Sequence, residues 1–104
     1  MQIGAFSDYP TREKLEALGL KHWFDLHLCS TDPEINIFKP SPEGIHLACR
    51  TWRLTPEKLM YVGDQAHIDG VAAAAAGARF VLVGQSQNRE HFAVRDFFEL
   101  AGCL

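Results

Sequence analysis

A chain of 104 residues, 47% of them hydrophobic and 22% charged, has the composition of a globular protein and the length of one domain at most. Its net charge of −3 and scattered basic residues exclude the basic footprint of a protein that binds nucleic acid or an anionic membrane. The apolar stretches fall short of the roughly 20 residues of a membrane helix, and three cysteines without metal-type spacing, with no signal peptide, predict a cytoplasmic protein.

The first forty residues predict two strands and one helix. Residues 2–6 form an apolar run that predicts a strand with Ser7 at its carboxyl end. The helix that follows extends to about Leu18, because proline is favoured in a first helical turn and glycine ends helices. Residues 26–29 predict a second strand, and residues 30–39 a loop rich in turn-forming residues.

The rest of the chain predicts three helices and two strands. A Ser-Pro pair at residues 41–42 begins a helix whose apolar residues recur at i, i+3, i+4 and i+7, which predicts one buried face. Strands are predicted at residues 59–62 and 79–83, on either side of an alanine-rich helix over residues 67–76. Apolar residues on one face predict a last helix over residues 88–101. The alanine-rich helix is predicted to bury Ile68, Val71, Ala72, Ala75 and Ala76.

Strands that alternate with helices predict an α/β fold with a parallel sheet covered on both faces. Ligands of such sheets bind at the carboxyl ends of the strands. Ser7 and Asp64 both lie at such ends, so we expect the functional residues at this edge.

Two carboxylates at this edge predict a metal site. Asp64 follows a buried strand and a glycine, and Asp69, five residues later, can fold back over the same crevice. Mg²⁺ suits such a pair, since it usually takes one or two protein carboxylates together with phosphate oxygens. The alternative is that Asp64 caps the next helix and Asp69 is a solvated surface charge.

Lys39 and Ser7 are candidates for binding a phosphoryl group beside this pair. The proline after Lys39 restricts the backbone and so fixes the direction of the lysine side chain. Its ammonium would neutralise phosphate charge, and the Ser7 hydroxyl and backbone N–H could donate to a phosphoryl oxygen. Each residue taken alone is more often an ordinary loop or strand-end residue.

The order of Ser7, Lys39, Asp64 and Asp69 resembles the second, third and fourth motifs of the haloacid-dehalogenase-like (HAD) hydrolase superfamily. The resemblance covers about residues 3–84. It implies a partial Rossmann-like (HAD-like) core of four parallel strands with flanking helices. It also implies Mg²⁺ as cofactor, a small phosphorylated substrate, and attack by an aspartate on phosphorus to give an aspartyl-phosphate that water hydrolyses.

The resemblance also implies a role for each residue. Ser7 would bind the transferring phosphoryl group, and Lys39 would hold that group and the nucleophile in register. Asp64 would ligate Mg²⁺, and Asp69 would support or complete the metal site. The presence of both acidic residues favours the phosphatase branch over the metal-free dehalogenase branch.

The first motif of the family, a nucleophilic aspartate and an acid/base aspartate two residues later, is missing, because no D-x-D occurs in the chain. The resemblance therefore implies one partial core domain over residues 1–104 without its central first strand, and no cap domain in the chain. We expect the carboxyl-terminal portion of a phosphatase that is inactive by itself. Its two exposed inner strands would pair with a missing amino-terminal segment, drive self-association, or pair with each other.

Two other functions fit parts of the pattern. A non-catalytic HAD-like interaction or regulatory module would explain the missing nucleophile, although such a module has little reason to keep all four site residues. A receiver-like phosphoacceptor domain fits less well, because a receiver places its acidic cluster before its lysine, and here Lys39 precedes Asp64.

Overall fold

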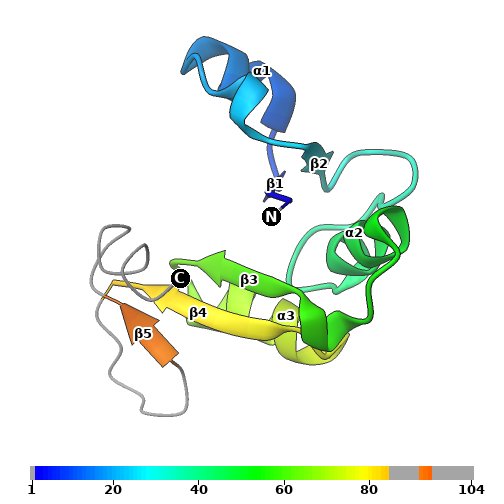
Figure 1. Cartoon of the computed structure of the whole chain (residues 1–104), viewed down its shortest axis with the longest axis vertical. Helices are drawn as coiled ribbons and strands as arrows, with labels where there is room; N and C mark the ends of the chain where they lie inside the picture. The colour runs from blue at the N-terminus through cyan, green and yellow to red at the C-terminus, as the bar shows by residue number, and fades with distance from the viewer. Residues whose placement is uncertain (1, 85–91, 95–104) are drawn as a thin grey trace.

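Strands and helices alternate along residues 2–84 and 92–94, which are the residues that the computed structural model describes (Figure 1). The strands are β1 (Gly4–Ser7), β2 (Leu26–Cys29), β3 (Met60–Gly63), β4 (Arg79–Val83) and β5 (Phe92–Val94). The helices are α1 (Thr11–Ala17), α2 (Glu43–Trp52) and α3 (Val71–Ala76). Shorter helical turns are the 3₁₀ turns η1 (Lys21–Trp23) and η2 (Pro56–Lys58) and the π-helical turn η3 (Ala66–Gly70). The predicted α/β class is confirmed.

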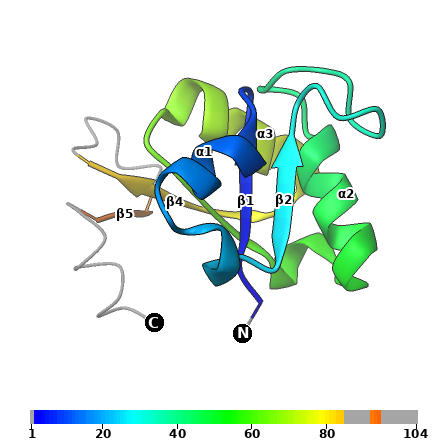
Figure 2. The same cartoon turned by 90° about the horizontal axis from the view of Figure 1, so that it is seen from above.

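The strands are parallel, as predicted, but they form two sheets within the described residues. β1 pairs with β2, which Figure 2 shows side by side, and a second sheet has the order β3-β4-β5. α1 lies on one face of the β1–β2 pair and α2 on the other (Figure 1). β1 and β3 are not paired with each other, so the direct pairing of the two inner strands that the sequence left open is not present here.

One edge of β1 has no partner strand within the described residues. The carbonyls of Ile3 and Ser7 accept hydrogen bonds from the segment that contains β2, the first of them from the Asp25 N–H at 2.6 Å. Peptide groups alternate in direction along a strand, so those of Gly4 and Phe6 point to the opposite edge. That edge is the one that β2 leaves open.

β3 has an open edge of the same kind. The Leu59 carbonyl accepts a hydrogen bond from the Arg79 N–H at 3.1 Å, on the side of β4. The same alternation turns the peptide groups of Met60 and Val62 away from β4. No strand of the described residues pairs with them.

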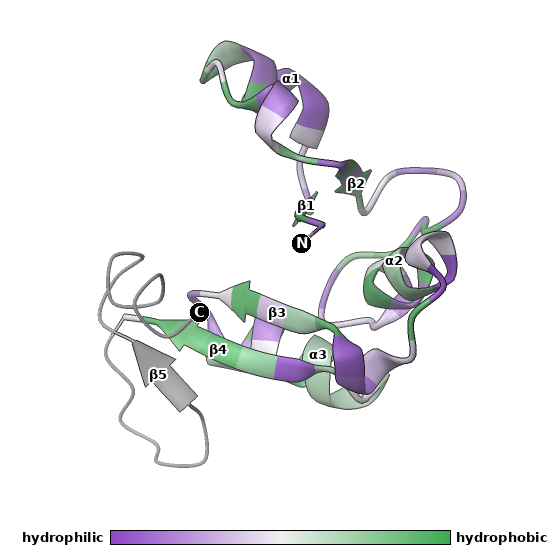
Figure 3. Ribbon diagram, in the orientation of Figure 1, coloured by the Kyte–Doolittle hydropathy of each residue, from purple (hydrophilic) through white to green (hydrophobic). Residues whose placement is uncertain are grey.

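The main core lies where the β1–β2 pair, α2 and α3 meet. α2 buries Ile45, Ala48 and Cys49, as the predicted face requires, and Trp52 is half-buried beside them. Figure 3 shows hydrophobic residues along β3 and β4 and on parts of α2 and α3. The buried members of this core are Leu28, Ile35, Ile45, Ala48, Cys49, Leu59, Ala72, Ala73 and Ala76.

The alanine-rich helix begins differently from the prediction. Residues 66–70 form a π-helical turn, which is wider than an α-helical turn and so rotates the residues after it around the helix axis. Val71 and Ala75 are therefore exposed, and α3 buries Ala73 in their place. The prediction of the buried stripe was wrong at these positions.

The prediction of a last helix over residues 88–101 was also wrong where it can be compared. Residues 92–94 form β5, which pairs with β4 in parallel, and the remainder of the predicted helix lies outside the described residues. A short apolar run is compatible with either a helix or a strand, and here pairing with β4 decides between them. None of the helices in the described part of the chain has the length and apolar character to cross a bilayer.

Candidate functional site

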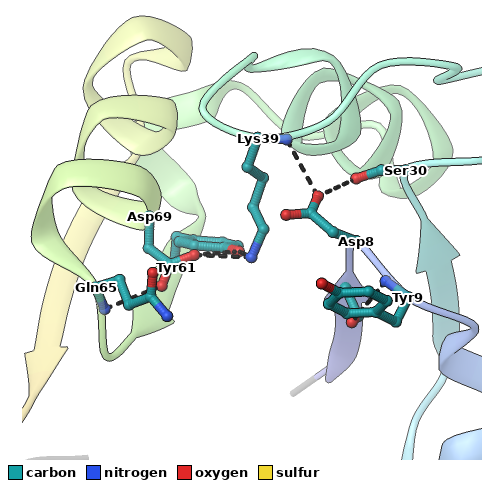
Figure 4. Close-up of polar contacts among 8 residues, drawn as sticks. Asp8, Tyr9, Ser30, Lys39, Tyr61, Gln65 and Asp69 are labelled. Atoms are coloured by element: carbon teal, nitrogen blue, oxygen red, sulfur yellow. Dashed lines mark hydrogen bonds and ion pairs between the residues drawn. The ribbon is translucent and has the colours of Figure 1, made fainter.

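Lys39 connects the two sheets. It lies in the loop between β2 and α2, before a cis peptide bond to Pro40. Its backbone N–H donates to Asp8 Oδ1 at 3.1 Å, just beyond the carboxyl end of β1. Its ammonium extends the other way and donates to Asp69 Oδ1 at 2.8 Å, beside β3 (Figure 4). One residue therefore spans the carboxyl ends of β1 and β3.

Lys39, Asp69 and Tyr61 form a polar cluster in which Asp69 is buried and the other two residues are half-buried. The Tyr61 hydroxyl lies 3.3 Å from Lys39 Nζ and 3.2 Å from Asp69 Oδ1, so the three polar groups contact one another (Figure 4). The side chains of Lys39 and Asp69 are 13% and 6% exposed. Pairing compensates for the loss of water around both charges.

The pKa values of this cluster reflect burial and pairing. Burial raises the pKa of Tyr61 to about 12, against a weaker lowering influence of the Lys39 charge. Burial by itself lowers the pKa of Lys39, but the hydrogen bond to Asp69 and the contacts with Tyr61 outweigh it, so the pKa is raised overall. The lysine is therefore cationic at neutral pH.

Asp69 reaches this position because of Gly63 and the π-helical turn. A Cβ on Gly63 would lie 2.4 Å from Asp69 Oδ2 and 2.5 Å from Asp69 Cβ, distances that no side chain tolerates. The turn buries Asp69 to 4% exposure and brings its Oδ2 within 3.2 Å of the Gln65 N–H, which donates to it. The glycine before Asp64 is thus required to make room for the second carboxylate.

Aromatic rings enclose the ammonium. Lys39 Nζ lies 5.5 Å from the centroid of the Phe6 ring and 6.0 Å from that of Tyr61, within cation–π range. The Phe6 ring in turn packs on Gly44, where any Cβ would overlap it. Phe6 belongs to β1, so the site draws residues from both sheets.

The structure brings Lys39 and Asp69 together, but it places Ser7 and Asp64 only nearby. Ser7 is half-buried between Phe6 and Asp8, both of which contact Lys39, and its Oγ accepts the Tyr9 N–H at 3.1 Å. That bond uses an oxygen lone pair and leaves the hydroxyl hydrogen able to donate.

Asp64 has an open environment. It is exposed, and it lies between Gly63 and Gln65, which both contact Asp69. The residue is therefore accessible to solvent and lies next in the chain to two residues that contact Asp69.

As a metal site, the arrangement offers the exposed Asp64 and the buried Asp69. Both oxygens of Asp69 accept hydrogen bonds, Oδ1 from Lys39 and Tyr61 and Oδ2 from Gln65. Among residues 2–84, no three His, Cys, Asp or Glu side chains gather as a metal-binding group. The exposed Asp64 fits a Mg²⁺ ion that keeps several waters and takes its remaining ligands from a phosphate.

Sequence reasoning missed Tyr61, Asp8 and Phe6 as residues of the site. A tyrosine in an otherwise apolar strand is a signal in itself, because a buried hydroxyl needs a partner. Asp8 follows directly after the strand that carries Ser7, but its partners lie more than twenty residues away and cannot be inferred from local sequence.

Comparisons with known proteins agree on one family. Residues 4–77 match the family described as haloacid dehalogenase-like hydrolase. The chain is 38% identical over 79 residues to a phosphoserine phosphatase of Thermus thermophilus. This match covers 76% of this chain and 31% of that protein. It is 36% identical over 80 residues to a glyceraldehyde 3-phosphate phosphatase of Methanopyrus kandleri, which covers 75% of this chain and 34% of that protein. The chain thus spans about a third of the length of these curated relatives.

A solved structure shows the same fold. The HAD phosphatase from Thermococcus onnurineus superposes with a TM-score of 0.84 at 24% identity, over 98% of this chain and 49% of that one. The likeness at this identity concerns the fold alone, and this chain accounts for about half of the solved chain.

Proposed function

Since the chain belongs to the haloacid dehalogenase-like hydrolases, we propose that it forms the phosphate-binding and metal-binding side of a Mg²⁺-dependent phosphatase site. The observation that carries this proposal is the ammonium of Lys39, held by Asp69 and Tyr61 in a residue that spans the carboxyl ends of β1 and β3. A cation held in place and largely shielded from solvent at this edge is better suited to a phosphoryl group than a mobile surface lysine.

Lys39 would bind a phosphoryl oxygen without losing its present partner. An ammonium has three N–H donors, of which Asp69 accepts one and Tyr61 lies within reach of a second. The remaining donor is available to a ligand. Asp69 would thus act by orienting Lys39, a role different from the support or completion of the metal site that the resemblance implied for it.

Ser7 would donate a second hydrogen bond to the same phosphoryl group. Its Oγ is fixed by the Tyr9 N–H, and its hydroxyl hydrogen remains able to donate. Phe6 and Asp8, which flank Ser7, both contact Lys39, and this supports a shared ligand for the serine and the lysine.

Asp64 would hold Mg²⁺ through its exposed carboxylate. The metal, when bound, would neutralise charge on phosphoryl oxygens. Asp69 would contribute mainly through Lys39, because its Oδ1 already accepts hydrogen bonds from Lys39 and Tyr61 and its Oδ2 accepts one from the Gln65 N–H.

A small phosphorylated metabolite is the proposed substrate class. The two curated relatives are named for phosphoserine and for glyceraldehyde 3-phosphate, which are both small phosphate monoesters. The chain contains no D-x-D pair, so a nucleophile of that motif must come from outside these residues, and we expect no turnover by the chain alone. A strand that pairs with the open edges of β1 and β3, from a further segment or a second copy of the chain, would be placed beside Lys39.

Calorimetric titration with orthophosphate, with and without Mg²⁺, tests this function. We expect weak binding that Mg²⁺ strengthens, loss of binding in Lys39→Met, and loss of only the Mg²⁺ effect in Asp64→Asn. Lys58→Met is the matched control, because Lys58 is exposed and its loss changes the net charge equally. K39M by itself leaves the Asp69 charge without its partner and could prevent folding. The double variant K39M/D69N removes both charges, so it tests phosphate binding even if K39M does not fold.

Two results would contradict the proposal. One is that the folded wild-type chain binds no orthophosphate at millimolar concentration. The other is that K58M loses as much affinity as K39M, which would mean a nonspecific charge effect. Phosphate binding that Mg²⁺ leaves unchanged would favour the non-catalytic module, which the absence of D-x-D also fits.

A further inference from the structure

Asp8 ties together three segments that meet at the site. Its Oδ1 accepts the Lys39 N–H at 3.1 Å and also accepts a short hydrogen bond from the Ser30 hydroxyl (Figure 4). Ser30 is 1% exposed and directly follows β2, while Asp8 directly follows β1. A single carboxylate oxygen therefore joins the end of β1, the end of β2 and the loop that carries Lys39.

The loop between β2 and α2 is attached to the end of β1 by the hydrogen bond from the Lys39 N–H to Asp8. Ile37 closes the preceding turn by donating its N–H to the Ser30 carbonyl at 3.1 Å. Phe38, the next residue, is 59% exposed and so gives little packing to hold the backbone. The bond from Lys39 to Asp8 fixes the backbone just where the lysine side chain leaves it toward Asp69.

We propose that Asp8 is a positioning residue for Lys39, and that it acts as a hydrogen-bond acceptor and not through its charge. This inference rests on the proposed phosphoryl-binding role of Lys39. Both of its bonds use Oδ1, which an asparagine retains as an amide oxygen of the same shape. Its negative charge, by contrast, opposes an anion bound at the neighbouring ammonium.

The two effects of Asp8 predict opposite results for alanine and asparagine. If Asp8 positions Lys39, Asp8→Ala weakens orthophosphate binding, and Asp8→Asn binds at least as tightly as the wild type because the acceptor stays and the charge goes. If Asp8 acts through charge alone, both variants bind orthophosphate more tightly than the wild type. If its charge is needed for the site, both variants bind less tightly. The last two outcomes overturn the proposal.

Amide hydrogen exchange of Lys39, followed by NMR in the same variants, tests the positioning directly. We expect the Lys39 amide to exchange roughly tenfold faster in D8A, as the loss of a hydrogen bond to a charged group requires, and at the wild-type rate in D8N. An unchanged rate in D8A overturns the proposal whatever the phosphate titration shows. If the wild-type chain binds no orthophosphate, the proposed function fails, and the exchange rates still decide whether Asp8 holds the loop.

Asp25→Ala is the matched control for loss of stability. Asp25 Oδ2 accepts the Ile3 N–H at 2.7 Å, which makes it a carboxylate of the same kind at the other end of β1. Its removal should lower the thermal stability without a selective effect on the Lys39 amide. Equal acceleration of that amide in D25A and D8A would show a general loosening of the fold and would overturn the proposal.

Discussion

Lys39 contributes to structure and to the proposed chemistry with different atoms. Its N–H is held by Asp8, and its ammonium is held by Asp69 and Tyr61. A long side chain anchored at both ends loses most of its rotamer freedom before any ligand arrives. That cost is met on folding, so a phosphoryl group would bind a cation that is already oriented.

Tyr61 predicts a pH dependence of stability. The raised pKa of about 12 means that the folded chain holds the phenol proton more tightly than the unfolded chain, where the pKa is near 10. Its contribution is therefore full below about pH 10 and is lost as the pH rises toward 12, and the raised pKa of Lys39 acts in the same direction. Tyr61→Phe should show a shallower decline over this range, measured as the free energy of urea unfolding against pH.

Tyr9→Phe is the control for this measurement. The Tyr9 side chain is exposed, so the loss of its hydroxyl should leave the alkaline decline as steep as in the wild type. Parallel curves for Y61F and the wild type would show that the Tyr61 hydroxyl is not buried in the cluster.

At the scale of elements, the strand β3 and the π-helical turn after it work as one unit. Gly63 lacks the Cβ that would collide with Asp69, and the turn directs that carboxylate back over the glycine. Gly63→Ala should destabilise the fold by about 1–3 kcal/mol, the usual range for overpacking. It should also separate Asp69 from Lys39, which lysine-selective NMR of the ammonium group would detect.

Gly4→Ala serves as the comparison for G63A. Its Cβ would meet a ring carbon of Trp52 at 2.9 Å, which is the far end of a side chain that can move. We expect a smaller loss of stability and an unchanged ammonium signal. If G63A behaved like G4A in both measurements, the close approach of Asp69 to β3 would be wrong.

Local sequence patterns predicted most of the helices and strands. They did not predict which residues of the alanine-rich helix are buried, or that residues 92–94 form a strand. Apolar runs and turn residues were sufficient for β1 to β4 and for the buried face of α2. The π-helical turn was not predictable from local sequence, and the Asp69 that it contains is paired with Lys39, a residue 30 positions earlier in the chain. β5 was missed for a similar reason, since its pairing with β4 and not its own sequence decides its structure.

The residues of the site also fall into those that local sequence predicted and those that it did not. The sequence motifs predicted Lys39 and Asp69, and the structure brings their side chains into contact. The partners that orient them, Tyr61 and Asp8, act over distances in the chain that no local pattern encodes. The roles of Ser7 and Asp64 stay predictions, because among the described residues no hydrogen bond or ion pair joins the side chain of either to Lys39, Asp69 or Tyr61.

In the molecule as a whole, each of the two sheets ends in a strand with an open edge among the described residues. β1 and β3 each have one edge without a partner strand in the described residues, and an unpaired edge is a template for another strand. We expect the amides of Phe6 and Val62, which point to these edges, to exchange much faster than those of Ala5 and Tyr61. Hydrogen exchange of a dilute sample measures this alternation along both strands.

The concentration dependence of that exchange tests the proposal that the chain pairs with itself. If a second copy fills the edges, protection of Phe6 and Val62 should rise together with the mass measured by light scattering. Protection that is already equal along both strands in a dilute monomer would contradict the open edges.

The most direct test of the phosphatase site is a crystal structure of the chain grown with orthophosphate and Mn²⁺ as an anomalous substitute for Mg²⁺. We predict the anomalous peak at the Asp64 carboxylate, the phosphate within hydrogen-bond distance of Lys39 Nζ and Ser7 Oγ, and the ion pair of Lys39 with Asp69 intact. A metal bound directly by Asp69 with that ion pair broken, or a phosphate bound away from Lys39, would contradict the account.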